Sequence, residues 1–320
     1  MDRYQPLNIY RSNYFEPQTS EEECPLHIPD EYNEKYEKLE KLFNSFFNVD
    51  SYSLANDNSK NEREKLNNID PSFIYGEVTF RSLAYIFEYI KNTNDITSGA
   101  FYDLGSGIGR GVLAAAFLFP FTKYVGIEYL ETLYNTSLDV KKQYDENFLK
   151  IFEENKEIMT DISIENEEVE VRTNSSNINS EGNNSKNSDS NIKTEKIYNI
   201  YNKDEKKEEN KEENKEENKA NPQPPTIKLP EMLFFKDDFL KIPIRDASFV
   251  FANSTCFSME LMLALSKKCK AECKEGCFVI TFTKKLPNLG PDWEIKNGFK
   301  RNMSWGIATV FVHHKKYSNK

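Results

Sequence analysis

The sequence predicts an α/β protein built on a mainly parallel β-sheet, and three observations support this fold class. A short apolar run at residues 100–102 leads into a glycine-rich turn at 103–109, after which small apolar residues can form a helix. Strand-like and helix-like segments then alternate up to a fifth strand at 276–286. The remaining residues fit an antiparallel hairpin that ends in the apolar run 308–314. Such alternation is typical of a parallel sheet covered by helices.

The glycine-rich turn is predicted to bind a ligand. Gly105, Gly107 and Gly109 let the backbone approach a ligand closely, and the helix that begins there points unpaired N–H groups at it. Asp103 is expected at the carboxyl end of the first strand, where open α/β sheets bind their ligands. The dinucleotide fingerprint GxGxxG requires glycine where this chain has Arg110, so the spacing favours S-adenosylmethionine over NAD. A turn that serves packing alone is the alternative.

The amino-terminal segment is expected to form an arm followed by a helix. Residues 1–30 contain four prolines and show no sustained period, which indicates an extended arm. Residues 31–47 place apolar side chains at helical spacing, so we expect a helix that packs on the catalytic core. Residues 50–69 are polar and predict a loop, which can include a short helix. The whole segment 1–70 can serve as a substrate-recognition cap or as a packing arm.

A candidate lid lies just before the first strand. Residues 74–80 read IYGEVTF and lead into a helix over 81–91 with an apolar stripe. Because this helix directly precedes the strand, the loop before it can fold over the glycine turn. Tyr75, Glu77 and Thr79 are then placed to meet the polar end of a ligand.

A second strand is predicted over residues 123–128, ending in Glu128. This acid lies 23 residues past Gly105, close to the offset at which a carboxylate takes the two hydroxyls of a ribose. A long helix is expected from Leu130. Its expected apolar positions are Leu133, Leu138, Tyr144, Phe148 and Phe152.

Residues 153–226 are predicted to be a disordered, low-complexity insertion. They lose all periodicity and include three KEEN repeats over 207–218. Segments this polar cannot bury enough apolar area to offset the entropy of ordering. A solvated single helix over the repeats is the alternative.

The third and fourth strands are predicted at 232–235 and 247–253. Asp238 and Phe239 follow the third strand and suit an adenine ring, since a carboxylate accepts from the exocyclic amine while the aromatic ring packs on the base. The fourth strand is continuously apolar, as a strand buried on both faces should be. A helix is expected over 258–271.

This order of elements is that of class I S-adenosylmethionine-dependent methyltransferases, with a Rossmann-like seven-stranded sheet and an amino-terminal helical segment. The methyltransferase domain is expected over residues 71–152 and 227–316, interrupted by the insertion at 153–226.

Charge and cysteine content indicate the compartment and the partners. The net charge is -10, yet residues 281–320 carry 8 basic and 2 acidic groups, a charge of +6, so DNA would be attracted only to this end. Five cysteines and no amino-terminal signal segment favour a reducing, intracellular compartment, nuclear or cytoplasmic. No apolar run approaches the roughly 20 residues of a membrane-spanning helix, so we expect a soluble protein. We also expect it to be a monomer.

Two further groups of residues invite a functional interpretation but are not expected to have one. Cys269, Cys273 and Cys277 recur every fourth residue, but Gly276 is expected to end the helix first. No CxxC pair or nearby histidine completes a ligand set, so no metal site is predicted. The histidines at 313–314 are expected at the exposed end of the last strand.

Several motifs taken together resemble the catalytic domain of the DOT1 family, the non-SET histone lysine methyltransferases. They are IYGEVTF, YDLGSGIGRGVLAAA, VGIE, DDF, NSTCF and a late MSWG followed by ATVFVHH, and they span residues 71–314 apart from the insertion. The glycine motif alone is common to many methyltransferases. The YGE loop, the NxxxF loop and the late tryptophan in this order are more discriminating.

The resemblance implies a set of site residues. The 75–79 loop would contact the methionine part of S-adenosylmethionine, the 103–107 turn its amino-acid moiety, Glu128 the ribose, and Asp238 with Phe239 the adenine. The implied cofactor-binding residues are Tyr75, Glu77, Thr79, Asp103, Gly105, Ser106, Gly107, Glu128, Asp238, Phe239 and Asn253. The implied catalytic residues are Asn253, beside the methyl group, and Phe257 and Trp305, which would line a lysine channel with Phe311 as a further candidate for its wall.

The chain departs from the family pattern at two positions in the channel region. It has Ser254 and Phe311 where the family usually has asparagine and tyrosine, and it lacks an evident lysine-rich tail. Histone H3 in nucleosomes is therefore one candidate substrate. A non-histone protein lysine methyltransferase, resembling the small family that modifies an ATP synthase subunit, is a second possibility. A non-enzymatic, cofactor-binding scaffold is the third.

Overall fold

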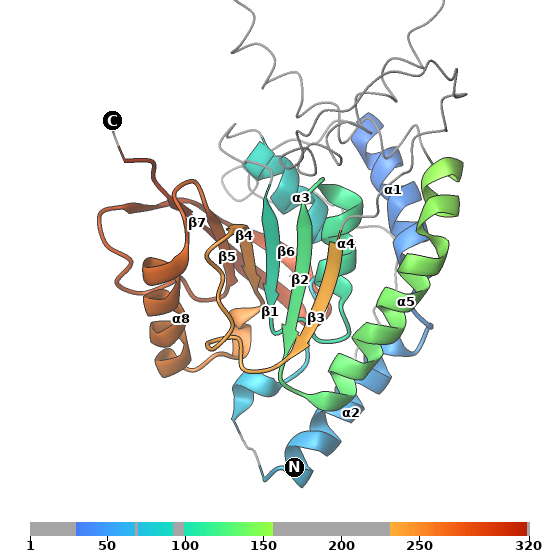
Figure 1. Ribbon diagram of the computed structural model, residues 1–320, viewed down its shortest axis with the longest axis horizontal. Helices are drawn as coiled ribbons and strands as arrows, with labels where there is room; N and C mark the ends of the chain where they lie inside the picture. The colour runs from blue at the N-terminus through green and yellow to red at the C-terminus, as the bar shows by residue number, and fades with distance from the viewer. Residues whose placement is uncertain (1–29, 68–69, 92–98, 156–230, 319–320) are drawn as a thin grey trace, which may run out of the picture. The chain divides into compact units, whose positions relative to one another are not determined.

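The computed structural model describes residues 30–67, 70–91, 99–155 and 231–318, which form a seven-stranded sheet of order β3-β2-β1-β4-β5-β7-β6 (Figure 1). The strands are β1 (Ala100–Leu104), β2 (Lys123–Glu128), β3 (Glu231–Lys236), β4 (Ala247–Ala252), β5 (Phe278–Phe282), β6 (Trp293–Met303) and β7 (Gly306–Lys315). The first five are parallel, and β7 runs antiparallel to both β5 and β6. The predicted α/β class and the seven-stranded, Rossmann-like sheet are confirmed.

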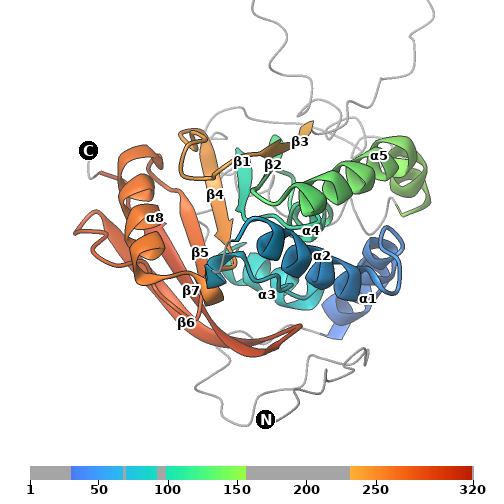
Figure 2. The ribbon, with the colours of Figure 1, turned by 90° about the horizontal axis from the view of Figure 1, so that it is seen from below.

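Helices cover both faces of this sheet. The helices are α1 (Asp30–Asn44), α2 (Ser51–Lys65), α3 (Phe80–Lys91), α4 (Arg110–Leu118), α5 (Glu131–Glu154) and α8 (Met259–Glu272), with short 3₁₀ turns η2 (Pro71–Phe73) and η4 (Ser254–Cys256). Figure 2 shows α3 and α4 on one side of the curved sheet and α8 on the other. The sheet belongs to a unit made of Met1–Tyr144 and Glu231–Lys320, and Asp145–Pro230 forms a second unit.

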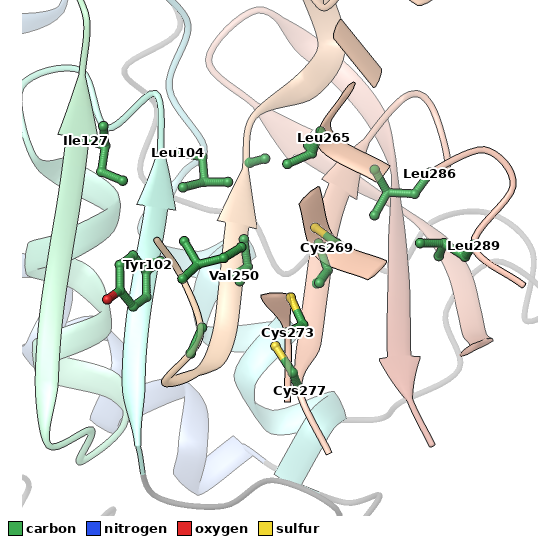
Figure 3. Close-up of a cluster of buried hydrophobic side chains, with 14 of the residues drawn as sticks. Tyr102, Leu104, Ile127, Val250, Leu265, Cys269, Cys273, Cys277, Leu286 and Leu289 are labelled. Atoms are coloured by element: carbon green, nitrogen blue, oxygen red, sulfur yellow. The ribbon is translucent and has the colours of Figure 1, made fainter. Parts of the chain in front are cut away.

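The two faces of the sheet bury different kinds of side chain, because successive strand residues point to opposite faces. On the α3 side, Phe101 of β1 packs on Phe249 of β4 and on Phe87 of α3, with ring centroids 5.6 and 6.3 Å apart. On the α8 side the core is mainly aliphatic, and it includes Val250 and Leu265 (Figure 3). Every residue of β4 is buried, which confirms the prediction of a strand covered on both faces.

Three cysteines lie in the core under α8. Figure 3 shows Cys269, Cys273 and Cys277 close together among aliphatic side chains, and all three are buried. The helix α8 ends at Glu272, before Gly276, as the sequence predicts. Within the described ranges no three or more His, Cys, Asp or Glu side chains are grouped so as to hold a metal ion.

The predicted helix over 31–47 corresponds to α1, which buries Tyr36, Leu39 and Phe43. The predictions of an arm over 1–30 and of an insertion over 153–226 fall almost wholly outside the described residues. Among the described helices, none has the length and apolar character needed to cross a membrane.

The prediction of a loop over 50–69 that can include a short helix was wrong for most of the stretch, because it forms the 15-residue helix α2. Its buried positions are the small residues Ala55 and Ser59, four apart on one face. The Ser59 hydroxyl donates to the Phe73 carbonyl (2.9 Å), and Ala55 packs near Leu130. Small and polar contact residues leave no hydrophobic period, so the pattern of apolar residues misses the helix.

The apolar face expected for α5 was also partly wrong. Leu138 is exposed, whereas Ser137 and Val140 are buried together with Leu133 and Tyr144. The true buried face follows the spacing 133, 137, 140, 144, which a buried serine interrupts. The side chains of the other two expected positions, Phe148 and Phe152, lie outside the described residues.

The two histidines of β7 are buried, which corrects the prediction that they mark an exposed strand end. The hairpin folds so that β7 lies between β5 and β6, and β6 is the outer strand. The Leu286 N–H donates to His313 Nε2 (3.0 Å), so Nδ1 carries the proton and donates to the Val279 carbonyl (2.9 Å). Burial lowers the pKa of His313 to about 4, so its ring is neutral near pH 7. His314 is buried beside Phe278.

Candidate functional site

The glycine turn after β1 has the conformation that its sequence predicts. Gly105, Gly107 and Gly109 have φ values of 87°, 54° and 87°, in the left-handed region that favours glycine. The N–H groups of Gly105 and Ser106 both donate to the carbonyl of Ile127 in β2 (2.9 and 3.0 Å). The turn is therefore fixed against the next strand, with Gly105 exposed and residues 106–109 buried.

Asp103 lies at the carboxyl end of β1, directly beneath the turn. Only 3% of the residue is exposed, and a methyl group at Gly111 of α4 would collide with its Oδ2. Burial, and after it the charge of Glu128, raises the pKa of Asp103 to about 8. A carboxyl group in this state is stabilised by any cation that enters the site.

Glu128 ends β2, the neighbouring strand, and it too is buried. Its Oε2 accepts from the Gly107 N–H (2.8 Å), and its Oε1 accepts from the N–H groups of Tyr129 and Leu130 (both 2.9 Å). Burial nevertheless raises the pKa of Glu128, because desolvation outweighs these three hydrogen bonds. The structure therefore brings two buried acids to the same turn.

The loop before α3 covers the glycine turn. A Cβ placed on Gly107 would lie 2.6 Å from the Tyr75 ring, so this ring lies directly on the turn. The Tyr75 hydroxyl donates to Glu77 Oε1 (2.6 Å), and Glu77 Oε2 pairs with Arg110 Nε (3.1 Å). Burial raises the pKa of Glu77, while the charge of Arg110 and the hydroxyl of Tyr75 oppose this shift.

The same loop is docked on the turn between β6 and β7. The Glu77 N–H donates to Ser304 Oγ, and the Ser304 N–H donates to the Glu77 carbonyl (both 3.0 Å). A Cβ on Gly76 would lie 2.7 Å from the Trp305 ring, and Asn253 Nδ2 donates to the Gly76 carbonyl (2.8 Å). Gly76 is thus held between Trp305 and Asn253, two of the expected catalytic residues.

Thr79 and Asp238 use their side chains in local structure. Thr79 Oγ1 accepts from the Ser82 N–H at the start of α3 (3.2 Å) and also lies 3.2 Å from the Asn302 carbonyl. Asp238 Oδ1 accepts from the Leu240 N–H just after β3 (2.9 Å). Neither side chain has a described contact with the glycine turn.

Phe257 stacks on Phe239, with ring centroids 5.7 Å apart, against the core under α8. No ring contact joins Phe257 to Trp305 among the described residues. Phe311 instead packs on Gly298 of β6. Ser254 is fully buried and exchanges hydrogen bonds with the backbone of Phe282 in β5 (2.9 and 3.0 Å). At the two departures from the family pattern, Phe311 therefore packs within the hairpin and Ser254 bridges η4 to β5.

Two buried polar atoms in this region have no hydrogen-bond partner in the structure, Ser106 Oγ and Asn253 Oδ1. Buried polar atoms are normally paired, so each is available to a ligand. Together with the acids Asp103 and Glu128, they fit a ligand that carries both a cation and polar groups. S-adenosylmethionine has an ammonium, a sulfonium and ribose hydroxyls, and the residues present fit it.

Sequence reasoning missed the role of Arg110. It used this residue only to reject the dinucleotide fingerprint, whereas the structure pairs it with Glu77. A cation at the first position of a helix is unfavourable in the field of the helix dipole, and this local conflict was a signal available from the sequence.

A sheet of this order, with a glycine turn after β1 and acids at the ends of β1 and β2, defines a class I S-adenosylmethionine-dependent methyltransferase domain. Residues 58–178 match the family model described as "Histone methylation protein DOT1". Over these residues the chain is therefore similar to the DOT1 family. No curated protein matches the sequence.

The similar solved structures include methyltransferases of low sequence identity. An RNA methyltransferase from Salinibacter ruber in complex with S-adenosyl-L-homocysteine is 13% identical, with a TM-score of 0.34 and coverage of 73% of this chain and 93% of that chain. A ribosomal protein L11 methylase from Lactobacillus delbrueckii subsp. bulgaricus is 11% identical, with a TM-score of 0.36 and coverage of 74% and 79%. The fold assignment rests on the sheet order.

Proposed function

We propose that this protein transfers a methyl group from S-adenosylmethionine to a lysine amine of a protein, with histone H3 in nucleosomes as the first candidate substrate. The observation that carries the proposal is the arrangement at one turn. The buried acids Asp103 and Glu128 meet the glycine turn there, and the 75–78 loop covers it. The DOT1 match supports a protein acceptor of the histone class.

Each cofactor residue has a proposed role that follows from its chemistry. Asp103 holds the ammonium of the methionine part, since its carboxyl group is buried and no described residue forms an ion pair with it. The backbone of Gly105, Ser106 and Gly107 lies along the same moiety. Three N–H groups use three of about four acceptor sites on the Glu128 carboxylate, so one ribose hydroxyl can bind without displacing them.

The other cofactor residues act at the two ends of the ligand. Tyr75 closes over the turn, Glu77 holds the Tyr75 hydroxyl, and Thr79 sets the start of α3 behind them. Asp238 and Phe239 provide an acceptor and an aromatic surface for the adenine.

The acceptor lysine must reach the methyl group as a neutral amine, because an ammonium has no lone pair for in-line attack. When bound, S-adenosylmethionine supplies a methyl group on a sulfonium, which is the electrophile. Phe257 and Trp305 are proposed to line the approach and exclude water, which lowers the pKa of an entering lysine. The unpartnered Asn253 Oδ1 can accept an N–H of that amine and aim its lone pair.

A non-histone protein substrate is the second candidate, and the charge of the chain favours it. The net charge is -10, and the basic end offers Lys296, Lys300, Arg301, Lys315, Lys316 and Lys320. Several of these are engaged within the protein. Lys296 pairs with Glu294 (2.7 Å), Arg301 lies over the Tyr85 ring, and Lys315 Nζ donates to the Cys273 carbonyl (2.8 Å). Strong binding to nucleosomal DNA is therefore not expected from this end.

The test is labelling with tritiated S-adenosylmethionine, using core histones, nucleosomes and a cell extract in parallel. Labelled histone H3 in nucleosomes supports a nuclear enzyme of the first kind, and a single labelled non-histone band supports the second. Binding of cofactor without label supports a scaffold and overturns the proposal. Asp103→Ala and Glu128→Ala serve as controls, and full cofactor affinity in both variants by calorimetry would refute the proposed site.

A further inference from the structure

Arg110 stands where a cation is unfavourable. It is the first residue of α4, and the positive end of the helix dipole lies at that position. The side chain is also largely shielded from water, with 14% of its surface exposed. A shielded guanidinium in an unfavourable field requires compensating partners, and these partners come from two separate parts of the chain.

The first set of partners comes from α1 and the residues just after it. The guanidinium carbon lies 4.7 Å from the centroid of the Phe43 ring and 4.3 Å from that of the Phe47 ring, both within cation–π range. Arg110 Nη2 also donates to Asn44 Oδ1 (3.2 Å). The amino-terminal segment therefore holds the guanidinium group in place.

The second partner is the loop over the glycine turn. Arg110 Nε pairs with Glu77 Oε2 (3.1 Å), and 8% of the Glu77 side chain is exposed. The other oxygen of Glu77 accepts from the Tyr75 hydroxyl, and the Tyr75 ring lies on Gly107. A continuous series of contacts thus runs from α1 through Arg110 and Glu77 to the cover of the cofactor turn.

We propose that Arg110 is a positioning residue that keeps the 75–78 loop closed over the glycine turn, and that α1 is thereby part of the cofactor site. This inference rests on the proposed function, because it assigns the closed loop to cofactor binding. Arg110 itself does not touch the cofactor. Its role is to hold Glu77, which orients Tyr75, while Phe43 and Phe47 keep the guanidinium in its shielded position.

The size of the effect follows from the closed fraction of the loop. If loss of the ion pair lowers this fraction from near one to about 1–10%, the apparent Kd for cofactor rises about 10- to 100-fold. Arg110→Met should show this change, and Arg110→Lys should recover part of it, since lysine keeps the charge but loses the planar contacts with both rings. Phe47→Leu should weaken binding by about 3- to 10-fold, although it is one contact further from the loop.

The matched control is Arg81→Met. Arg81 also joins α1 to the core, through Glu40 (2.8 Å) and Glu37 (3.7 Å), but neither of these partners lies in the loop. This variant should lower the thermal unfolding temperature and leave the Kd within about twofold. A purely structural role of Arg110 would instead make the Arg110 and Arg81 variants alike.

The experiment uses the full chain and measures two quantities. Calorimetry with S-adenosylhomocysteine gives the Kd, and hydrogen exchange without ligand reports opening of the loop at the Glu77 amide, which is bonded to Ser304 Oγ. Faster exchange and weaker binding in Arg110→Met and Phe47→Leu, but not in Arg81→Met, support the inference. Unchanged exchange and unchanged Kd in Arg110→Met and Phe47→Leu overturn the inference. If Arg110→Met does not fold, the same two measurements on Phe47→Leu and Arg110→Lys test it.

Failure of the proposed function would look different. If the wild-type chain binds no S-adenosylhomocysteine, the cofactor assignment and the role of the closed loop in binding both fall. The exchange measurement still shows in that case whether Arg110 holds the loop.

Discussion

Replacing Asp103 by asparagine is expected to stabilise the folded protein while weakening its affinity for cofactor. Burial, followed by the charge of Glu128, raises the pKa of Asp103 from 3.8 to about 8. In the unfolded chain the carboxyl has its ordinary pKa. Between about pH 4 and pH 8 the folded protein therefore binds one proton more than the unfolded chain, and the free energy of unfolding falls as the pH rises through this window.

The magnitude follows from one titrating proton. A full proton of difference changes the free energy of unfolding by about 1.4 kcal/mol per pH unit. With a folded pKa of about 8, the loss between pH 6 and pH 8 is about 2 kcal/mol, since titration is half complete at the upper limit. Asp103→Asn has no such titration, so its advantage over wild type should grow by that amount, or about 4–8 °C in Tm.

The assay is urea or thermal unfolding of both proteins at pH 6, 7 and 8. Asp246→Asn is the matched control. Asp246 directly precedes β4, at the amino ends of the parallel strands, and it pairs with Lys123 (2.6 Å) and has its pKa lowered. That variant should be destabilised by a similar amount at each pH. A constant difference between Asp103→Asn and wild type from pH 6 to pH 8 would mean that Asp103 is ionised throughout, and the reasoning would be refuted.

The same titration should appear in ligand binding. If Asp103 holds an ammonium as a carboxylate, the competent fraction is about 1% at pH 6 and about half at pH 8. The affinity of wild type for S-adenosylhomocysteine should then improve by about 50-fold over this range. Asp103→Asn should bind weakly at every pH.

Three further predictions test the surroundings of the site. Gly105→Ala and Gly107→Ala should each lose about 1 kcal/mol of stability from positive φ, and Gly107→Ala should in addition displace the covering loop and weaken cofactor binding, because its Cβ would lie 2.6 Å from the Tyr75 ring. Between pH 7 and pH 5 the wild-type free energy of unfolding should fall by about 2 kcal/mol through His313, because its folded pKa of about 4 lies below the unfolded value and the unfolded chain binds the extra proton. His313→Gln should lack this fall when urea unfolding is measured at both pH values. Ser254→Ala should lower stability by about 1–3 kcal/mol at every pH without a matching change in cofactor Kd, and a large change in Kd would place Ser254 in the site.

The parts of the fold that the sequence predicts well are those with a local signal. The strand at 247–253 is recognisable because both of its faces are buried, so its apolar run is continuous. The glycine turn at 103–109 is recognisable because each of its three glycines takes a positive φ that other residues avoid. In both cases the physical requirement acts on the residue itself.

The features that the sequence does not predict depend on residues far apart in the chain. The helix α2 buries Ala55 and Ser59, and Glu62 accepts from the N–H groups of Glu131 and Thr132 at the start of α5 (2.7 and 2.9 Å). None of these contacts leaves a hydrophobic period. Likewise His313 is buried only because β7 folds between two other strands, which a local pattern does not specify.

The residues of the candidate site also differ in whether a local signal in the sequence predicts them. Asp103 and Glu128 are predictable because each acid ends a strand at a fixed offset from the glycines, and parallel strands bring their carboxyl ends to one edge. The function of Arg110 is not, because its partners Phe43, Phe47 and Glu77 come from segments whose arrangement is decided by packing.

The burial that makes these acids costly also makes them selective. The carboxylate of a buried acid is poorly hydrated, so it is stabilised most by a ligand that carries a positive charge. A cationic ligand is therefore favoured over a neutral one of the same shape. The covering loop strengthens this preference, since excluding water increases the attraction between opposite charges. Closure of the 75–78 loop and ionisation of Asp103 should therefore be coupled to the same event, the arrival of a cation at the turn, and a variant that opens the loop should also lower the pKa of Asp103.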